Sequence, residues 1–252
     1  VFSHIMRGEK TMTIQSLVTK WNMFFDTFLN KGGYKEVLTG LLNTLIIALL
    51  ALVLGIIIGT IIAAIEVQPK KYGAWGKALA VLKKISGIYV AFFRGTPMVV
   101  QLLLGYFVIL PLLGINLSSI VVATLIMGLN SGAYVSEIMR SGILSVDIGQ
   151  MEAGRALGLG YGTTMWKIII PQAVKNILPT LGNELISLVK ETSVVSFIGV
   201  VDLYKAFRNI GSGNYEYMMP FLVMAVIYIV IILIITFALK MMERGLRASD
   251  KR

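Results

Sequence analysis

Residues 37–65 contain no charged side chain, and this long apolar run is the strongest constraint on the fold. A helix needs about 20 apolar residues to cross the hydrocarbon core of a bilayer, so the run is predicted to be a membrane span with room for tilt. Hydrophobic residues make up 56% of the 252-residue chain and charged residues 14%. Soluble domains carry about 25% charged residues, so the composition indicates a membrane protein.

A second charge-free stretch, residues 95–136, is too long for a single span. A proline, a glycine and an asparagine within residues 111–116 interrupt it, which predicts two spans joined by a tight turn. The first of these spans is expected to begin near Ile88 and to carry the segment 94–97 within it. The next is expected at about 118–139.

Two more spans are predicted in the C-terminal half, at about 174–198 and at 219–239, which gives five spans in all. The basic segment 66–87 is expected to be a loop that holds at most one short helix. The polar segment around Lys205 and Arg208 is expected to be a second loop.

Residues 1–36 form an N-terminal segment before the first span. Within it, residues 14–29 place aromatic and aliphatic side chains on one face at helical spacing, which predicts an amphipathic helix. Such a helix lies in the membrane interface or packs on the outer face of the protein. Residues 1–6 surround the only histidine, His4, and resemble a vector scar, so no inference uses them.

Lysines and arginines predict the topology, because cytoplasmic loops are enriched in them. The loop after the first span carries five, the segment 140–175 four and the tail five. The loop between spans two and three carries none, and the loop between spans four and five carries two. The N-terminal segment also carries five, but they are spread over some thirty residues and weigh less than the other loops. We therefore expect a multi-pass membrane protein with the N-terminus outside and the C-terminus in the cytoplasm. The membrane domain is expected at 37–245 and the tail at 246–252.

Cysteine is absent from the chain, so a disulfide framework, a thiolate metal site and a cysteine nucleophile are not expected. The net charge of +10 is assigned to cytoplasmic loops rather than to a nucleic-acid partner, because the basic residues interrupt apolar spans. No catalytic residue and no metal site are predicted.

A polar segment of some thirty residues inside a compact membrane protein needs a reason. Residues 140–172 contain a helix-forming stretch at 146–158, a glycine break at Gly158 and Gly160, and an apolar run that ends at Pro171. This pattern predicts a short helix that lies across the membrane surface, turns sharply and leads into the fourth span. Such a helix offers one face to a cytoplasmic partner.

This loop resembles the signature of importer permeases of the ATP-binding-cassette (ABC) class. The family pattern is Glu-Ala-Ala, a glycine four residues after the second alanine and, after nine further residues, Ile-x-Leu-Pro. Five positions match it in register: Glu152, Ala153, Gly158, Ile168 and Pro171. Gly154 stands at the second alanine and Ile170 at the leucine. The glycine is expected to loosen the short helix by roughly 1 kcal/mol.

The resemblance implies that residues 146–158 dock in a cleft of a separate ATPase subunit and transmit its closure to the spans. The positions assigned to this coupling are Gln150, Glu152, Ala153, Gly154, Arg155, Gly158 and Pro171. Glu152 and Arg155 are candidates for polar contacts with the ATPase, and their alternative is a solvated helix face. The chain contains no Gly-x-x-x-x-Gly-Lys-[Ser/Thr] loop, so ATP and magnesium are expected on the partner and no cofactor on this chain.

Two further segments resemble the polar amino-acid branch of the family, which includes histidine, glutamine and arginine permeases. They are residues 92–97 and residues 183–193. The resemblance covers about residues 35–245 and implies an all-α, five-span type I importer permease in a bacterial-type cell membrane, that is, an inner or plasma membrane. It also implies a second permease copy or paralogue, an extracytoplasmic binding protein and a polar or basic amino acid as cargo.

Ionisable groups at membrane depth cost free energy unless they are paired or hydrated, and therefore suggest function. In the fourth span, Thr180, Glu184, Ser187 and Glu191 lie within about 60° of one another, with Asn183 and Lys190 beside them. This polar face is expected to meet a water-filled cavity or the interior of the bundle. Its carboxylates are candidates for binding the cargo. The alternatives are a structural or gating ion pair with Lys190 and a surface position near the end of the span.

The third span places Met127, Asn130, Tyr134 and Glu137 on one side. Glu137 is expected to pair with Arg140 or Arg94, and Arg94 either meets the cargo carboxylate or extends to the membrane interface. The complete candidate cargo set is Glu184, Glu191, Ser187, Asn183, Asn130, Tyr134, Arg94 and the weaker Gln101.

Two other classes of protein fit the composition less well. An ion-coupled secondary carrier could use Glu184 and Glu191 as proton sites, but it leaves the 146–171 loop unexplained, and the five spans show no paired inverted repeats. An intramembrane enzyme lacks a catalytic constellation in this sequence.

Overall fold

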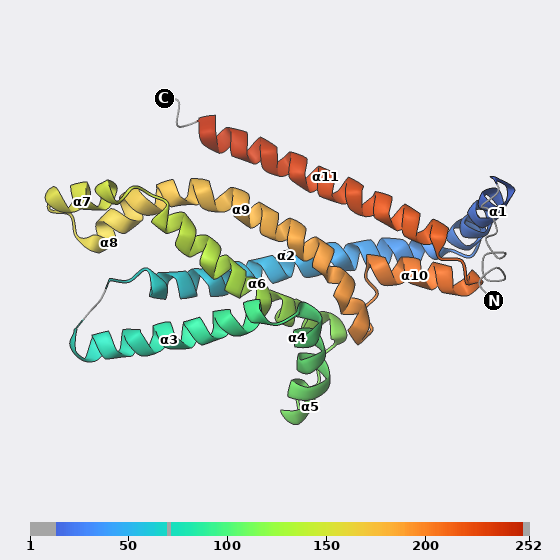
Figure 1. The fold of residues 1–252 in the computed structure, drawn as a ribbon, viewed down its shortest axis with the longest axis horizontal. Helices are drawn as coiled ribbons and strands as arrows, with labels where there is room; N and C mark the ends of the chain where they lie inside the picture. Colours follow the sequence, from blue (N-terminus) through green and yellow to red (C-terminus); the bar gives the residue numbers. More distant parts are fainter. Residues whose placement is uncertain (1–13, 70–71, 249–252) are drawn as a thin grey trace, which may run out of the picture.

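The computed structural model describes residues 14–69 and 72–248, and this part of the chain is helical with no strand (Figure 1). Residues 1–6, Lys70, Lys71 and the last four residues of the tail, all of which enter the sequence predictions, lie outside the described part.

The two helices with the most extensive contact are α2 (Gly33–Glu66) and α6 (Ser119–Leu144). They approach closely because α2 carries glycine at the contact. A Cβ on Gly59 would lie 2.7 Å from the backbone nitrogen of Ser136, and one on Gly55 would lie 2.6 Å from Ser131 Oγ. Gly55 and Gly59 form a Gly-x-x-x-Gly pair, a pattern that lets two membrane helices approach closely.

The basic segment after α2 corrects the prediction of a loop. Residues 73–95 form one helix, α3 (Gly73–Gly95), which includes Lys77, Lys83 and Lys84. Most residues of α3 are exposed, and Lys77 and Lys84 are among them, so the helix does not bury these charges. The Lys83 ammonium donates to the carbonyls of Glu66 and Gln68, at 2.8 and 3.0 Å, and so caps the end of α2.

The second span also differs from its prediction, because residues 94–97 interrupt it rather than lie within it. After Gly95 the chain bends by 109° into α4 (Met98–Leu104), the π-helical turn η3 (Gly105–Ile109) and α5 (Leu110–Leu112). The cause is Pro97, because a residue before proline is excluded from the helical region. Thr96 is accordingly extended, with φ −124° and ψ 147°.

The polar segment after the fourth span is also a helix and not a loop. The segment predicted as the fourth span forms α9 (Ile170–Glu191) and the 3₁₀ segment η5 (Thr192–Ile198), and α10 (Leu203–Asn214) follows. Asp202 caps α10 by accepting from the backbone nitrogens of Tyr204 and Lys205, at 3.0 and 3.1 Å. The apolar face of α10 is buried, which a reading by hydropathy alone does not detect.

The predicted N-terminal helix is present as α1 (Ile14–Phe25), followed by a π-helical turn, η2 (Asp26–Asn30). Phe24 is buried in a cluster with Val37 of α2, Phe207 of α10 and Met219 of α11 (Met218–Ala248). The Lys20 ammonium lies 3.0 Å from a Glu216 oxygen. One face of α1 therefore packs on the protein, while Ile14 is exposed on another.

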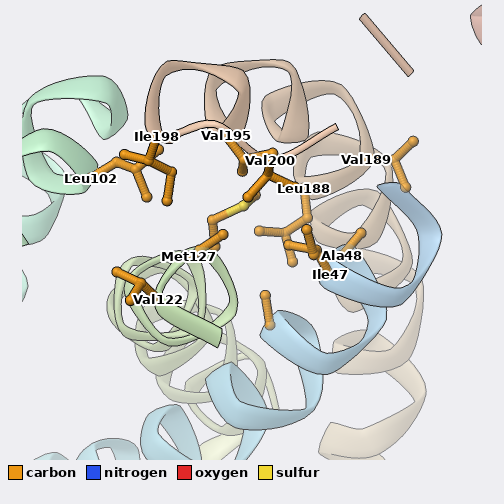
Figure 2. Close-up of a cluster of buried hydrophobic side chains, with 12 residues drawn as sticks. Ile47, Ala48, Leu102, Val122, Met127, Leu188, Val189, Val195, Ile198 and Val200 are labelled. Atoms are coloured by element: carbon orange, nitrogen blue, oxygen red, sulfur yellow. The ribbon is translucent and has the colours of Figure 1, made fainter. Parts of the chain in front are cut away.

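The central core lies where α2, α4, α6, α9 and η5 meet. Figure 2 shows Met127 of α6 reaching toward Leu188 of α9 and Val200, with Ile47 of α2 beside them. Met127 is fully buried, so this member of the predicted third-span face belongs to the core.

Three helices, α2, α6 and α11, are long and apolar enough to cross a membrane, and the bent pair of α3 with α4 to α5 forms a further candidate among the described residues. The polar helix α9 runs between α6 and α11, and the five-span count stays a prediction. Figure 1 shows α1 and α10 at one end of the molecule and α7 and α8 at the other, with the C-terminal end of α11 on the side of α7 and α8.

Candidate substrate path and coupling loop

The polar face of α9 remains open on the surface of the chain. Helix α6 packs on one side of α9, and α11 on another, where Gly182 lies against Leu239. Asn183 and Glu191 are exposed, and Glu184 and Ser187 are half-buried. An open polar face at membrane depth requires water or a protein partner against it, because lipid cannot hydrogen-bond these groups.

Glu184 is the member of this face that is tied to the bundle. Its Oε1 accepts a hydrogen bond from Ser131 Oγ of α6 at 2.8 Å, and Ser131 itself is fully buried against Gly55 of α2. The bond fixes the carboxylate at the junction of three helices. The second carboxylate oxygen of Glu184 makes no hydrogen bond within the described part of the chain and can meet a ligand.

Asn130 and Gln101 come together, but they hold the bend between α3 and α4. Asn130 Nδ2 donates to Gln101 Oε1 at 2.9 Å and to the Phe93 carbonyl at 3.2 Å. Gln101 Nε2 donates to the carbonyls of Phe93 and Thr96, at 2.8 and 3.0 Å, and to Thr96 Oγ1 at 2.8 Å. Both side chains are buried, so they support the backbone where α3 stops.

Arg94 and Tyr134 form a separate group with Glu137. The Arg94 guanidinium lies 5.5 Å from the centre of the Tyr134 ring and 3.7 Å from a Glu137 oxygen. Arg140 pairs with the same carboxylate at 3.3 Å. The predicted pairing of Glu137 is confirmed with both arginines. A cavity of about 350 Å³ adjoins this group and is lined by Glu137, Arg140 and Glu66 among others.

The eight candidate cargo residues thus fall into three groups. Glu184, Glu191, Ser187 and Asn183 share the open face of α9, Arg94 and Tyr134 pair across α3 and α6, and Asn130 with Gln101 braces the bend. Sequence reasoning missed Ser131, which orients Glu184. Its only signal was its place next to Asn130 on the third span.

The coupling loop begins with α7 (Ile148–Ala156), whose first turn is capped by Asp147 accepting from the Gly149 nitrogen at 2.7 Å. Gly158 then has φ +80°, a left-handed conformation that favours glycine, and the chain reverses. It continues through α8 (Tyr161–Thr164) and the π-helical turn η4 (Met165–Ile169) into α9. The predicted short helix and sharp turn are present, and the chain leads from them into α9.

Two contacts join this hairpin to the bundle. Tyr161 Oη donates to the Val67 carbonyl at the end of α2, at 3.1 Å, and burial raises the pKa of this phenol. Gln172 Nε2 lies 3.5 Å from Gln150 Oε1, across the start of α9 from α7. The hairpin of α7 and α8 is therefore attached to the end of α2 and to the start of α9.

The outer face of α7 is open. Ile148 and Leu157 are largely exposed, at 75% and 81%, and Glu152, Ala153 and Arg155 are exposed between them. Pro171 is exposed at the start of α9, whereas Gly154 is buried on the inner side. In Figure 1, α7 lies at the far end of the molecule from α1 and α10. Apolar and charged side chains mixed on an exposed helix are typical of a protein contact.

Residues 73–248 match the family model described as "binding-protein-dependent transport system inner membrane component". The chain is 44% identical over 166 residues to the arginine transport system permease protein ArtQ of Bacillus subtilis, which covers 66% of this chain and 76% of that protein.

Among solved structures, an amino acid ABC transporter crystallised with histidines matches with a TM-score of 0.75 and 36% identity, over 93% of this chain and 99% of that one. The MetNI methionine ABC transporter shares the fold, with a TM-score of 0.66 at 19% identity over 83% of this chain and 95% of that one. This chain belongs to the family of inner-membrane components of binding-protein-dependent, ABC-type transport systems.

Proposed function

We propose that this chain imports a polar or basic amino acid into the cytoplasm as the permease subunit of an ABC importer. The observation that carries the cargo assignment is the open polar face of α9, with a carboxylate fixed at the junction of three helices by Ser131. The similarity to ArtQ and to an amino acid ABC transporter supports the same cargo class.

The cargo contacts follow from charge. Glu184 and Glu191 offer carboxylates to an ammonium or a basic side chain, and Ser187 and Asn183 offer hydrogen bonds on the same face. Arg94, over the Tyr134 ring, offers a guanidinium to the cargo carboxylate. The two groups together match both ends of an amino acid.

The motor is a separate ATPase that binds ATP and magnesium and receives α7. A second permease, identical or paralogous, faces the open side of α9, and an extracytoplasmic binding protein delivers the cargo. Because α7 meets a cytoplasmic ATPase, the end of α11 is also cytoplasmic, and α1 and α10 lie outside. This orientation agrees with the distribution of lysine and arginine.

The test is ATP hydrolysis by the chain reconstituted with its ATPase, in the presence of its binding protein. We expect binding protein loaded with one or a few polar or basic amino acids to stimulate hydrolysis, and unloaded binding protein to stimulate it much less. Equal hydrolysis across a panel that includes apolar amino acids would refute the cargo assignment.

A further inference from the structure

An apolar groove of about 340 Å³ lies at the coupling end of the bundle, where α2, α6 and α9 diverge. The cargo path and the ATPase contact do not use it. Its walls are formed by small and aliphatic side chains, which include Ala63, Ala64, Met139, Ile143, Ile170 and Val174. Such a lining excludes a polar metabolite and fits a hydrocarbon chain.

The groove lies at the level of the membrane–water interface. It is formed by the last turns of α2 and α6 and the first turns of α9, next to the hairpin that carries α7. Trp166 and Tyr161 stand at its edge, and Trp166 is 72% exposed. Tryptophan and tyrosine are enriched at membrane–water interfaces, so the mouth of the groove lies at headgroup level.

Two lysines, Lys83 and Lys167, lie beside residues that line the groove. Gln68 lines the groove, and its carbonyl accepts from the Lys83 ammonium at 3.0 Å. Lys83 is bound there by carbonyl oxygens alone and makes no ion pair within the described ranges. Lys167 follows Trp166 on the other side, is exposed, and likewise has no ion pair in the described part of the chain.

The nearest carboxylate on α2 does not neutralise this mouth. Glu66 lines the other cavity, with Arg140 and Glu137, and its carboxylate forms no ion pair with Lys83 in the described part of the chain. The positive charge at the groove is therefore left for a ligand, and the cytoplasmic leaflet supplies anionic headgroups at this depth.

We propose that the groove binds one anionic glycerophospholipid from the surrounding bilayer. An acyl chain fills the apolar walls, and the phosphate lies at the mouth with Lys83 and Lys167. The lipid contacts both the end of α2 and the start of α9, beside the hydrogen bond from Tyr161 to Val67. It therefore stiffens the attachment of α7 to the bundle. This site assignment rests on the membrane orientation of the proposed function.

The test uses the full chain in detergent with Trp21→Phe and Trp75→Phe, which leaves Trp166 as its only tryptophan. Phosphatidylglycerol with brominated acyl chains quenches a nearby indole and is titrated against brominated phosphatidylcholine. We expect saturable quenching by the anionic lipid at a mole fraction at least about tenfold lower, as one or two charge-assisted contacts would give. Coincident curves for the two lipids would overturn the proposal.

Two sets of variants locate the site. Lys83→Gln with Lys167→Gln keeps donors for the α2 carbonyls, and it should move the anionic curve onto the neutral one. Ala64→Phe fills the groove from its exposed rim and should weaken quenching by both lipids, whereas Ala80→Phe, exposed on α3 outside the groove, should change nothing. Quenching that survives both the lysine variant and Ala64→Phe would place the lipid elsewhere. Because these readouts use neither cargo nor ATP, they fail independently of the amino-acid assignment.

Discussion

Gly154 of α7 lies directly against the side chain of Thr164 in α8. A Cβ on Gly154 would stand 2.5 Å from Thr164 Cγ2 and 2.8 Å from its Oγ1. Thr164 is fully buried, and its hydroxyl donates to the Gly160 carbonyl at 3.2 Å. The glycine that departs from the family pattern therefore permits a close contact between α7 and α8.

We predict that Gly154→Ala weakens coupling although alanine favours helix by about 1 kcal/mol. The added methyl group displaces α7 from Thr164, which is too enclosed to move aside. The measurement is ATP hydrolysis stimulated by loaded binding protein, which should fall severalfold while unstimulated hydrolysis changes less.

The partner substitution Thr164→Ala should restore much of this loss in the double variant, because it removes the two atoms nearest to the new methyl group and leaves only the Cβ, at 3.3 Å. Gly162→Ala is the matched control, since a Cβ there has no neighbour within 4 Å. A Gly154→Ala variant that couples as well as Gly162→Ala would show that the contact does not position α7.

Glu184→Gln is predicted to separate cargo binding from folding. Glutamine still offers an oxygen to Ser131 Oγ, so thermal stability should stay close to that of the parent. Loss of the charge should raise the KM for a basic amino acid roughly tenfold, since a charged hydrogen bond contributes about 1.5–3 kcal/mol.

Ser131→Ala should change the stability more than the KM. It removes the bond that orients Glu184 and lowers stability by about 1 kcal/mol, with a smaller change in KM. If Glu184→Gln left the KM unchanged for every transported amino acid, Glu184 would be a structural residue and not a cargo contact.

Gln101→Leu is predicted to destabilise the bend after α3. Its Nε2 donates to two carbonyls and one hydroxyl, and its Oε1 accepts from Asn130. Leaving these buried groups unpaired should cost about 1–3 kcal/mol, read as a lower midpoint of thermal unfolding. Gln172→Leu removes an exposed donor to the Ile168 carbonyl and to Gln150 Oε1, and because both contacts are exposed it should cost less than about 0.5 kcal/mol. Equal midpoints for the two variants would argue against this bracing role.

Asp202 gives a prediction for pH. Burial raises the pKa of this carboxyl to about 6, against the opposing hydrogen bonds from the backbone nitrogens of Lys205 and Tyr204. The folded state therefore holds the proton more tightly than the unfolded state, and stability falls as pH rises from about 4 to 6. Above that range the cost levels at up to about 3 kcal/mol.

Asp202→Asn keeps a capping oxygen and removes this dependence. The variant should gain stability over the parent at pH 7.5 and gain little at pH 4.5, measured as the difference in unfolding midpoint. A difference that is the same at both pH values would mean that Asp202 titrates normally.

The parts of the fold that follow local rules could be predicted from the sequence. The apolar run at 37–65 forms a long helix, as its length predicts. The turn at Gly158 needs a left-handed backbone, which glycine adopts readily. The bend after α3 was missed because hydropathy does not register Pro97, which stops a helix without adding charge. The helix α10 was missed because its polar face masks a buried apolar one.

The site could be predicted only as a set of residue types. Spacing placed Glu184, Ser187 and Glu191 on one face, which the structure retains. It could not assign Asn130 and Gln101 to the bend, because their partners are backbone carbonyls at residues 93 and 96. The role of Gly154 depends on Thr164, which lies across a turn and carries no signal in the family pattern.

We propose that this chain moves an amino acid across the membrane and that an ATPase on another polypeptide drives the movement. The most direct test is uptake of labelled arginine and glutamine into proteoliposomes that hold the chain and its ATPase, with binding protein outside. We predict that at least one of the two accumulates only when ATP, ATPase and binding protein are all present, and that collapsing the proton gradient has no effect. Uptake that persists without the ATPase and stops when the proton gradient is collapsed would contradict the account.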